Sequence, residues 1–370
     1  MESSFNGPII VISPFASNKF SGHSLIDDEF YFESLLNKVG SFTFYTSHYS
    51  AEKLKCKFPN AASLICPLEP YTPGGMGHFI FARKPYIPKG SKVIFFGYTE
   101  KLILAWLLLN IFKKSKLTLV ATNNLTLDRM KRYGGWAMKI FFVLLLKNLE
   151  QIVVHSECEA LTLSRLIPVI SDRCRIKRHH LMIPRASMRS RNLDDSIRIS
   201  FFGPPKSDKP IKPILDLISE DKFGKFSYDL YSINLQEVLS SGGWDVVPPW
   251  VRVHEEWLEY KDYLIKFANS DIVLLSHNRA FESKLSGNLC DCFSLGIPYI
   301  SSKIEPVVSF QRKYGEIGFL YDYDEENWAK NFIHSITHQE ISKRKNRLRN
   351  VGLHYSTENV RNDLEIALGL

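Results

Sequence analysis

The sequence of 370 residues has little cysteine and no apolar run long enough to cross a bilayer. Six irregularly spaced cysteines exclude a disulfide scaffold, and the close pair Cys290 and Cys292 lacks the second pair or histidine cluster of a zinc set. A membrane span takes about 20 apolar residues, whereas the longest apolar stretches are 102–109 and 140–146. We therefore expect reduced thiols, no bound metal and no transmembrane helix. The chain also opens without a signal-peptide pattern, and we expect a cytoplasmic protein.

The formal net charge of +8 is unevenly distributed. Residues 1–190 hold 25 Lys and Arg against 13 Asp and Glu, a net charge of +12, whereas residues 191–370 hold 22 against 26, a net charge of −4. Such asymmetry indicates an anionic partner for the first half: a membrane surface, a nucleic acid or a phosphorylated substrate. No zinc finger, RNP signature or arginine-rich recognition helix is present, so we expect no nucleic-acid partner. The two apolar stretches are flanked by lysines and aromatic residues, a pattern of interfacial helices as well as of buried ones.

Apolar, β-branched runs alternate with helical stretches, which predicts βαβ units and parallel sheets. A first set of strands is expected at 8–13, 42–45, 92–97, 116–122, 151–156 and 180–184. The pattern restarts after a polar, basic linker, with strands expected at 198–203, 226–231, 251–254, 270–276, 298–302 and 318–321. The segment 67–90 is rich in Pro and Gly and is expected to be a long loop.

This alternation predicts an α/β protein with two doubly wound Rossmann-like domains facing a central cleft, because ligands bind such sheets at the carboxyl ends of their strands. We place an N-terminal domain at 1–190 and a C-terminal domain at 191–344. A C-terminal helix within 345–370 is expected to be able to pack back on the first domain.

The most informative segment runs from Ser276 to Ser302 and holds a strand, a polar loop, a helix and another strand. Ser286 and Gly287 begin the helix, where free backbone N–H groups favour an anion. Arg279 and Lys284 precede it and could neutralise a phosphate, and Asp291 within the helix could accept hydrogen bonds from ribose hydroxyls. An ordinary N-cap and a solvated helix carboxylate are the alternative interpretations of these residues.

The same segment resembles the donor-binding segment of GT-B glycosyltransferases, particularly the retaining group with an E-x7-E motif, of the bacterial surface-polysaccharide type. In that group the second acidic residue lies five positions before the glycine of a G-x-P turn. Gly296 and Pro298 fix this register and place Asp291 on the acidic position. The first acidic position falls on Ser283, one residue beyond Glu282, so the motif is degenerate.

A second match lies at the start of the second domain, where the segment 201–210 resembles the family's strand-Gly-Arg-Leu…Lys-Gly segment. Gly203 ends the strand, and Lys206 and Lys209 fall on the positions of the two basic residues that hold the donor diphosphate in that group. A surface lysine loop is the alternative interpretation.

Candidate catalytic residues are less well defined. The Ser21-Gly22-His23 loop resembles the glycine-rich loop after the family's first strand, so His23 is a candidate, and Asp28 is one of several acidic candidates in the first domain. Glu282 is the nearest match to the family's first acidic residue. No candidate is favoured as the catalytic acid or base over the others, because acid–base catalysis depends on a geometry that the sequence does not supply.

The resemblance implies a hexosyltransferase that moves a sugar from a nucleotide-diphosphate sugar to a saccharide, expected to be lipid-linked, in the synthesis of a cell-surface polysaccharide such as lipopolysaccharide. It implies no cofactor beyond the donor substrate, and the lysines and the helix start could stabilise the departing diphosphate without a metal. We expect the basic N-terminal domain to bind the acceptor and the inner face of the membrane as a peripheral protein. A nucleotide-sugar epimerase and a non-catalytic nucleotide- or glycan-binding protein of the same fold are the alternatives.

Overall fold

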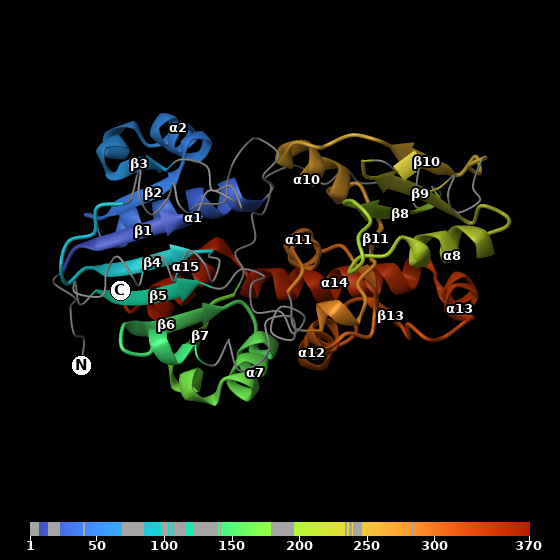
Figure 1. Cartoon of the computed structure of the whole chain (residues 1–370). Coiled ribbons are helices and arrows are strands. Elements are labelled where there is room, and N and C mark those ends of the chain that lie inside the picture. The colour runs from blue at the N-terminus through green and yellow to red at the C-terminus, as the bar shows by residue number, and fades with distance from the viewer. Residues whose placement is uncertain are drawn as a thin grey trace. The chain divides into compact units, whose positions relative to one another are not determined.

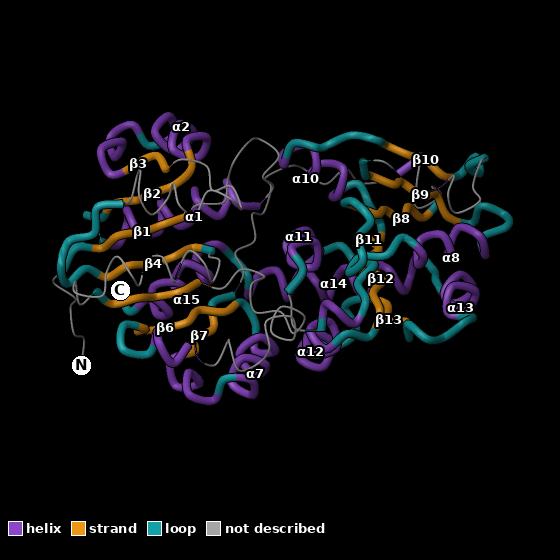
Figure 2. The backbone as a smooth tube through the Cα atoms, in the orientation of Figure 1, coloured by secondary structure: helices purple, strands orange, loops and turns teal. Residues whose placement is uncertain are grey.

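The protein forms two compact units, Met1–His180 with Glu358–Leu370, and Leu181–Thr357. The computed structural model describes residues 7–13, 23–39, 41–68, 85–97, 103, 106, 115–120, 140, 142–178, 196–233, 235–236, 239, 246–282 and 285–370. Each unit is built on one sheet with helices packed on it (Figures 1 and 2). The α/β fold with two Rossmann-like domains is thereby confirmed.

The first unit holds a seven-stranded parallel sheet in the order β3-β2-β1-β4-β5-β6-β7. Alternate residues of β1 and β4 enter separate hydrophobic clusters on the two faces, so the central strands are buried on both sides. The strands are β1 (Ile9–Ser13), β2 (Thr43–Ser47), β3 (Ile65–Leu68), β4 (Lys92–Phe96), β5 (Lys116–Val120), β6 (Leu149–Val154) and β7 (Cys174–Ile176). The helices include α1 (His23–Lys38), α2 (His48–Lys57), α7 (Glu157–Leu166) and α15 (Thr357–Leu368), with 3-10 turns η1 (Pro59–Leu64) and η2 (Pro168–Arg173).

Helix α15, the last of the chain, belongs to this first unit (Figure 1). Its residues Val360 and Leu364 pack in the same cluster as the strands of the sheet. Asp363 accepts hydrogen bonds from the guanidinium of Arg178, with 2.8 Å between its Oδ1 and Nη2. The preceding helix, α14 (His338–His354), instead packs in the second unit. The returning segment is therefore α15 alone rather than the whole of 345–370.

The second unit holds a six-stranded parallel sheet in the order β10-β9-β8-β11-β12-β13. The strands are β8 (Ile197–Phe202), β9 (Phe226–Tyr231), β10 (Val251–His254), β11 (Ile272–Leu275), β12 (Tyr299–Ser302) and β13 (Phe319–Tyr321). The helices include α8 (Lys212–Glu220), α10 (Tyr260–Ala268), α11 (Gly287–Leu295), α12 (Glu305–Tyr314), α13 (Trp328–Ser335) and α14, with the 3-10 turn η3 (Arg279–Phe281). This strand order places the carboxyl ends of β8 and β11 side by side at the point where the order reverses.

The prediction of a loop from residue 67 onward is wrong at its start, because Pro67 and Leu68 belong to strand β3. β3 lies at the edge of the sheet, with β2 as its neighbour on one side. An edge strand accepts proline because the missing N–H is not needed by a second neighbour. The strand expected at 180–184 and the linker at 185–195 lie outside the described residues.

Candidate functional site

The loops that follow β8 and β11 are fastened to each other by one asparagine. Asn278 donates a hydrogen bond from its side-chain amide to the carbonyl of Ser207 (2.6 Å) and one from its backbone N–H to the carbonyl of Asp208 (3.3 Å). Lys206 and Lys209 close the turn between them by two mutual backbone hydrogen bonds of 3.0 Å. The predicted donor loop is thus a tight turn held against the β11 loop.

Gly203 begins this loop directly after β8. Its φ of 98° lies in the left-handed region that side chains rarely adopt, so a glycine is required by the backbone conformation itself. Its N–H donates to the carbonyl of Tyr231, at the end of the neighbouring strand, over 3.0 Å. The chain therefore turns sharply out of the sheet at the position that the sequence predicted.

The two lysines of the turn have different surroundings. The ammonium of Lys209 lies 5.4 Å from the ring centroid of Phe281, and this ring stacks on the buried imidazole of His277 at 4.1 Å. Lys206 is exposed. Lys209 is consequently held over the β11 loop, close to the segment that leads into α11, whereas Lys206 extends into solvent.

Two buried hydroxyls near the start of α11 have no hydrogen-bond partner among the described residues. Ser286 is the N-cap, yet its side chain makes no capping hydrogen bond, and its buried Oγ has no hydrogen-bond partner among the described residues. The Oγ of Ser276, just beyond β11, is likewise buried without one. Gly287 is the first residue of the helix, and Asn288 donates its side-chain amide to the carbonyl of Phe202 at 3.3 Å. Helix starts with unused N–H groups and buried hydroxyls that need partners are typical of anion-binding positions.

Asp291 lies one turn further along α11 and is buried, with 4% of its surface exposed. Its Oδ2 accepts a hydrogen bond of 2.6 Å from the hydroxyl of Tyr263 on α10. Burial, and then the negative charge of Asp291, hold the pKa of Tyr263 well above its usual value. Tyr263 therefore stays a donor at any pH the protein meets. This partner could not be predicted from local sequence patterns, since it lies 28 residues away in the chain.

The other site residues predicted in this region are Arg279, Glu282 and Lys284. Arg279 points its guanidinium at Asp324 in the loop after β13, with 2.6 Å between Nη2 and Oδ2, and both side chains are largely exposed. Glu282 follows η3 and is exposed. Lys284 lies outside the described residues. Hydrogen bonds from Asn278 and Asn288 thus tie the loop after β8 to the β11 loop and to the first turn of α11. Arg279 instead pairs with Asp324.

In the first unit, Asp28 lies on α1 at the carboxyl ends of β1 and β2. It is 1% exposed, and its oxygens accept hydrogen bonds from the hydroxyls of Ser13 and Thr46, the latter over 2.7 Å. Burial raises its pKa from 3.8 to about 7, although these hydroxyls act in the opposite direction. Asp28 can therefore exchange a proton near neutral pH, but in this conformation it anchors α1 to the sheet and is covered. The side chain of His23, the first residue of α1, lies outside the described residues.

Sequence analysis missed an aromatic column at the carboxyl ends of β8, β9 and β10. Phe202, Tyr231 and His254 are the last residues of these three strands, and their rings stack with centroid distances of 4.9 Å and 4.4 Å. The signal was present, because an aromatic or imidazole ring lies at or next to the end of each of the three predicted strands and parallel neighbours place such ends together. This column continues the polar site toward the β10 edge of the sheet.

Among the described residues, no group of three or more His, Cys, Asp or Glu side chains could hold a metal ion. The sequence contains one Asp-x-Asp pattern, Asp322 to Asp324, of a kind that can bind metal ions. There the structure pairs Asp322 with Lys303 at 3.4 Å and Asp324 with Arg279 at 2.6 Å. In the same part of the chain, no helix is both long enough and apolar enough to cross a membrane.

Comparisons with known proteins identify the fold. No protein-family model and no curated protein matches the sequence. Alr3699/HepE of Anabaena, crystallised in complex with UDP, matches with a TM-score of 0.65 at 9% sequence identity, over 98% of this chain and 99% of that one. A glycosyltransferase of Rickettsia africae matches with a TM-score of 0.62 at 12% identity, over 98% of both chains.

An α,α-trehalose-phosphate synthase (UDP-forming) of Burkholderia vietnamiensis gives a TM-score of 0.63 at 9% identity, over 100% of this chain and 99% of that one. These structural neighbours are GT-B glycosyltransferases, as the resemblance in the donor segment implied. The chain has the GT-B fold. At such low identities the similarity concerns the fold, and the chemistry of the site has to be argued from this chain's own residues.

Proposed function

We propose that the protein is a glycosyltransferase that transfers a sugar, a hexose, from a nucleotide-diphosphate sugar to a saccharide acceptor. One observation carries this proposal: the buried hydroxyls of Ser276, just beyond β11, and Ser286, at the start of α11, have no hydrogen-bond partner among the described residues. Asn278 of the same β11 loop holds the Lys206–Lys209 turn through hydrogen bonds to Ser207 and Asp208. A diphosphate would supply the missing acceptors. A GT-B protein crystallised with UDP, with UDP and glucose, and with UDP-glucose supports the same class of donor.

The mechanism follows from where charge develops. Breaking the bond between sugar and diphosphate leaves positive charge on the sugar and negative charge on the leaving phosphate. Lys209, Lys206 and the N-terminus of α11 would stabilise that phosphate without a metal, since preorganised donors are most effective where charge appears. Asp291, held by Tyr263, would accept from the ribose. Lys284 and Arg279 remain further candidates for the phosphate, and His23, Asp28 and Glu282 remain the candidates for acid–base or sugar contacts.

The acceptor is proposed to be lipid-linked, in the synthesis of a cell-surface polysaccharide, with the basic first unit resting on the inner face of the membrane. The net charge of +12 belongs to residues 1–190, most of which lie in this unit. The unit also exposes about half of the surface of Val143, Leu144, Leu161 and Val169. Such a surface should bind anionic vesicles at low salt and leave them at high salt. Sedimentation without any salt-dependent binding would contradict the membrane role and leave the donor site untouched.

The donor site is tested by nucleotide binding to matched variants. Ser286→Ala removes a hydroxyl that has no hydrogen-bond partner in the described part of the chain. We therefore expect unfolding stability to be kept while affinity for UDP falls by about tenfold, the effect of one hydrogen bond to a charged group. Lys209→Ala should lower both affinity and turnover. Lys212→Ala is the control, because Lys212 is exposed on α8 and pairs there with Asp216 at 2.7 Å. Wild-type affinity for UDP in both Ser286→Ala and Lys209→Ala would contradict the assignment of the donor site.

Turnover separates the proposed transferase from its alternatives. UDP-, GDP- and CMP-sugars are each incubated with and without a lipid-linked saccharide, and the products are followed by mass spectrometry. A transferase releases the nucleotide diphosphate in step with glycosylation of the acceptor. An epimerase converts the donor alone, and a non-catalytic binding protein shifts the melting temperature with nucleotide but forms no product.

A further inference from the structure

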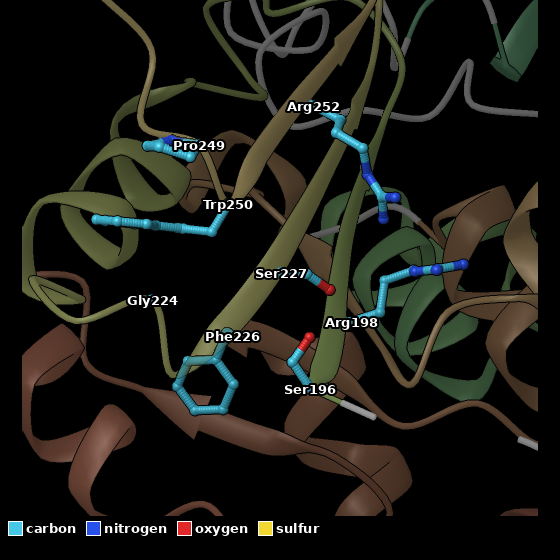
Figure 3. A pocket seen from close by; sticks show the side chains of 8 residues that line it. All are labelled: Ser196, Arg198, Gly224, Phe226, Ser227, Pro249, Trp250 and Arg252. Carbon is cyan, nitrogen blue, oxygen red and sulfur yellow. The ribbon is translucent and has the colours of Figure 1, made fainter. Parts of the chain in front are cut away.

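A second hollow lies in the second unit, at the opposite end of the sheet from the candidate donor site. Its volume is about 470 Å³, and the residues around it come from the amino ends of β8, β9 and β10 (Figure 3). Small-molecule pockets measure about 300–1,000 Å³. The hollow therefore has room for a molecule of monosaccharide size.

One side of this hollow is polar because of strand alternation. Arg198 on β8 lies beside Ser227 on β9, and Arg252 on β10 lies beside Asp229, two residues further along β9, so all four side chains share one face of the sheet. Figure 3 shows both guanidinium groups on this side, with the hydroxyls of Ser227 and Ser196 between the strands. The rings of Phe226 and Trp250 lie on the other side.

The charges of this face do not balance. The buried carboxylate of Asp229 accepts from Nε and Nη2 of Arg252 at 2.8 and 3.1 Å and pairs with Nε of Arg198 at 3.1 Å. The nearby Asp271 is already paired with Lys345 at 3.1 Å. Among the described residues around the hollow, two guanidinium groups therefore share one carboxylate, which leaves one positive charge in excess.

Ser227 adds a second, independent observation. Its Oγ is buried and has no hydrogen-bond partner among the described residues. Buried hydroxyls are normally hydrogen-bonded, so a partner from outside the protein is expected. An oxyanion would satisfy this hydroxyl and compensate the excess charge at the same time.

We propose that this hollow binds the phosphate group of a small phosphate ester, such as a sugar phosphate. The guanidinium groups of Arg198 and Arg252 supply charge and N–H donors of the fork geometry that suits phosphate, and the hydroxyls of Ser227 and Ser196 donate to its remaining oxygens. This site is separate from the donor site, because it lies at the amino ends of strands whose carboxyl ends carry the donor loop. It does not depend on the proposed transferase activity.

Calorimetric titration tests the proposal with inorganic phosphate and glucose 1-phosphate as probes. We expect saturable binding with a dissociation constant of about 1 mM or below, weakened by salt. Ser227→Ala should reduce the affinity by about tenfold and leave unfolding by urea unchanged, since the hydroxyl has no hydrogen-bond partner among the described residues. Ser219→Ala, on the exposed surface of α8, is the matched control and should bind as the wild type does.

Further arms identify the source of the phosphate and exclude the donor site. Lys206→Ala should bind glucose 1-phosphate with wild-type affinity. If Lys206→Ala loses this binding while Ser227→Ala keeps it in full, the ligand binds at the donor loop and the proposal is overturned. Vesicles of phosphatidic acid in phosphatidylcholine should not bind through this hollow. Vesicle binding that is lost in Ser227→Ala, with no binding of either soluble probe, would also overturn it. Absence of any saturable phosphate binding would do the same.

Discussion

Asp28 in the first unit and Asp229 in the second are both buried carboxyl groups, 1% and 3% exposed, but their surroundings differ. Asp28 is met by hydroxyls, which donate hydrogen bonds and bring no positive charge, and its pKa rises to about 7. Asp229 is met by two guanidinium groups and lies 3.4 Å from the imidazole of His254. Hydroxyl groups favour the charged carboxylate only through hydrogen bonds, whereas guanidinium groups also attract it by their positive charge.

The largest effect is expected for Asp229→Asn. The change removes the negative charge shared by Arg198 and Arg252 and leaves cations crowded over a partly buried face, so the free energy of unfolding should fall by about 3 kcal/mol. Urea unfolding measures this loss. Because the excess charge beside the hollow increases, affinity for glucose 1-phosphate should rise in the same variant. A loss below about 0.5 kcal/mol, as for a surface pair, would contradict the account of Asp229 as a charge-compensated group.

A smaller change in the free energy of unfolding, an increase instead of a decrease, is expected for Asp28→Asn. A carboxyl whose pKa is raised in the folded state binds its proton more tightly there than in the unfolded chain, so its contribution to stability is lost as pH rises from about 4 through about 7. Between pH 5 and 8 this group should lower the wild-type free energy of unfolding by about 2–3 kcal/mol. Asp28→Asn removes that dependence.

Urea unfolding of wild type and Asp28→Asn at pH 5 and pH 8 makes the comparison. The variant should gain stability relative to the wild type as pH rises. Equal pH profiles for the two proteins would mean that Asp28 is compensated in the way Asp229 is, and that the contrast between the units does not hold.

The smallest change in stability is expected when Asp291, the buried carboxylate of the candidate donor site, loses a hydrogen bond. Tyr263→Phe removes the hydroxyl that donates to it over 2.6 Å, and stability should fall by about 1–2 kcal/mol because a buried acceptor loses its partner. Tyr323→Phe, at an exposed ring, is the control. If Asp291 holds the ribose, UDP affinity should fall in Tyr263→Phe as well; a drop in stability with unchanged affinity would assign Asp291 to packing alone.

Much of the fold could be predicted from local patterns. The β-branched runs at 8–13, 92–97 and 270–276 are buried strands, and the Gly296 turn ends α11 in the left-handed conformation expected of a C-cap glycine. Strand β3 was not predicted, because proline argues against a strand unless the strand is known to lie at the edge of the sheet. The position of a strand in the sheet depends on the fold of the whole unit, so it cannot be predicted from the local sequence pattern.

The candidate site was predictable only in part. Gly203, Lys209, Ser286 and Gly287 could be placed together, because parallel strands bring the loops at their carboxyl ends to one edge. The partner of Arg279, and the covering of Asp28 by hydroxyls, depend on how loops and helices fold over that edge. Asn278, which fastens the two loops, gave no signal because asparagine is an ordinary loop residue.

By itself the sequence determined the strand–helix alternation, the uneven charge and the glycine, lysine and serine positions of the donor segment, since these depend on near neighbours in the chain. The tertiary structure decided which charges meet. Asp229, Arg198 and Arg252 share one face, and Tyr263 reaches Asp291, only because the register of three strands and the packing of α10 on α11 bring distant residues within hydrogen-bonding distance. Coulomb and hydrogen-bond energies fall steeply with distance, so the chemistry of both proposed sites arises in the folded chain.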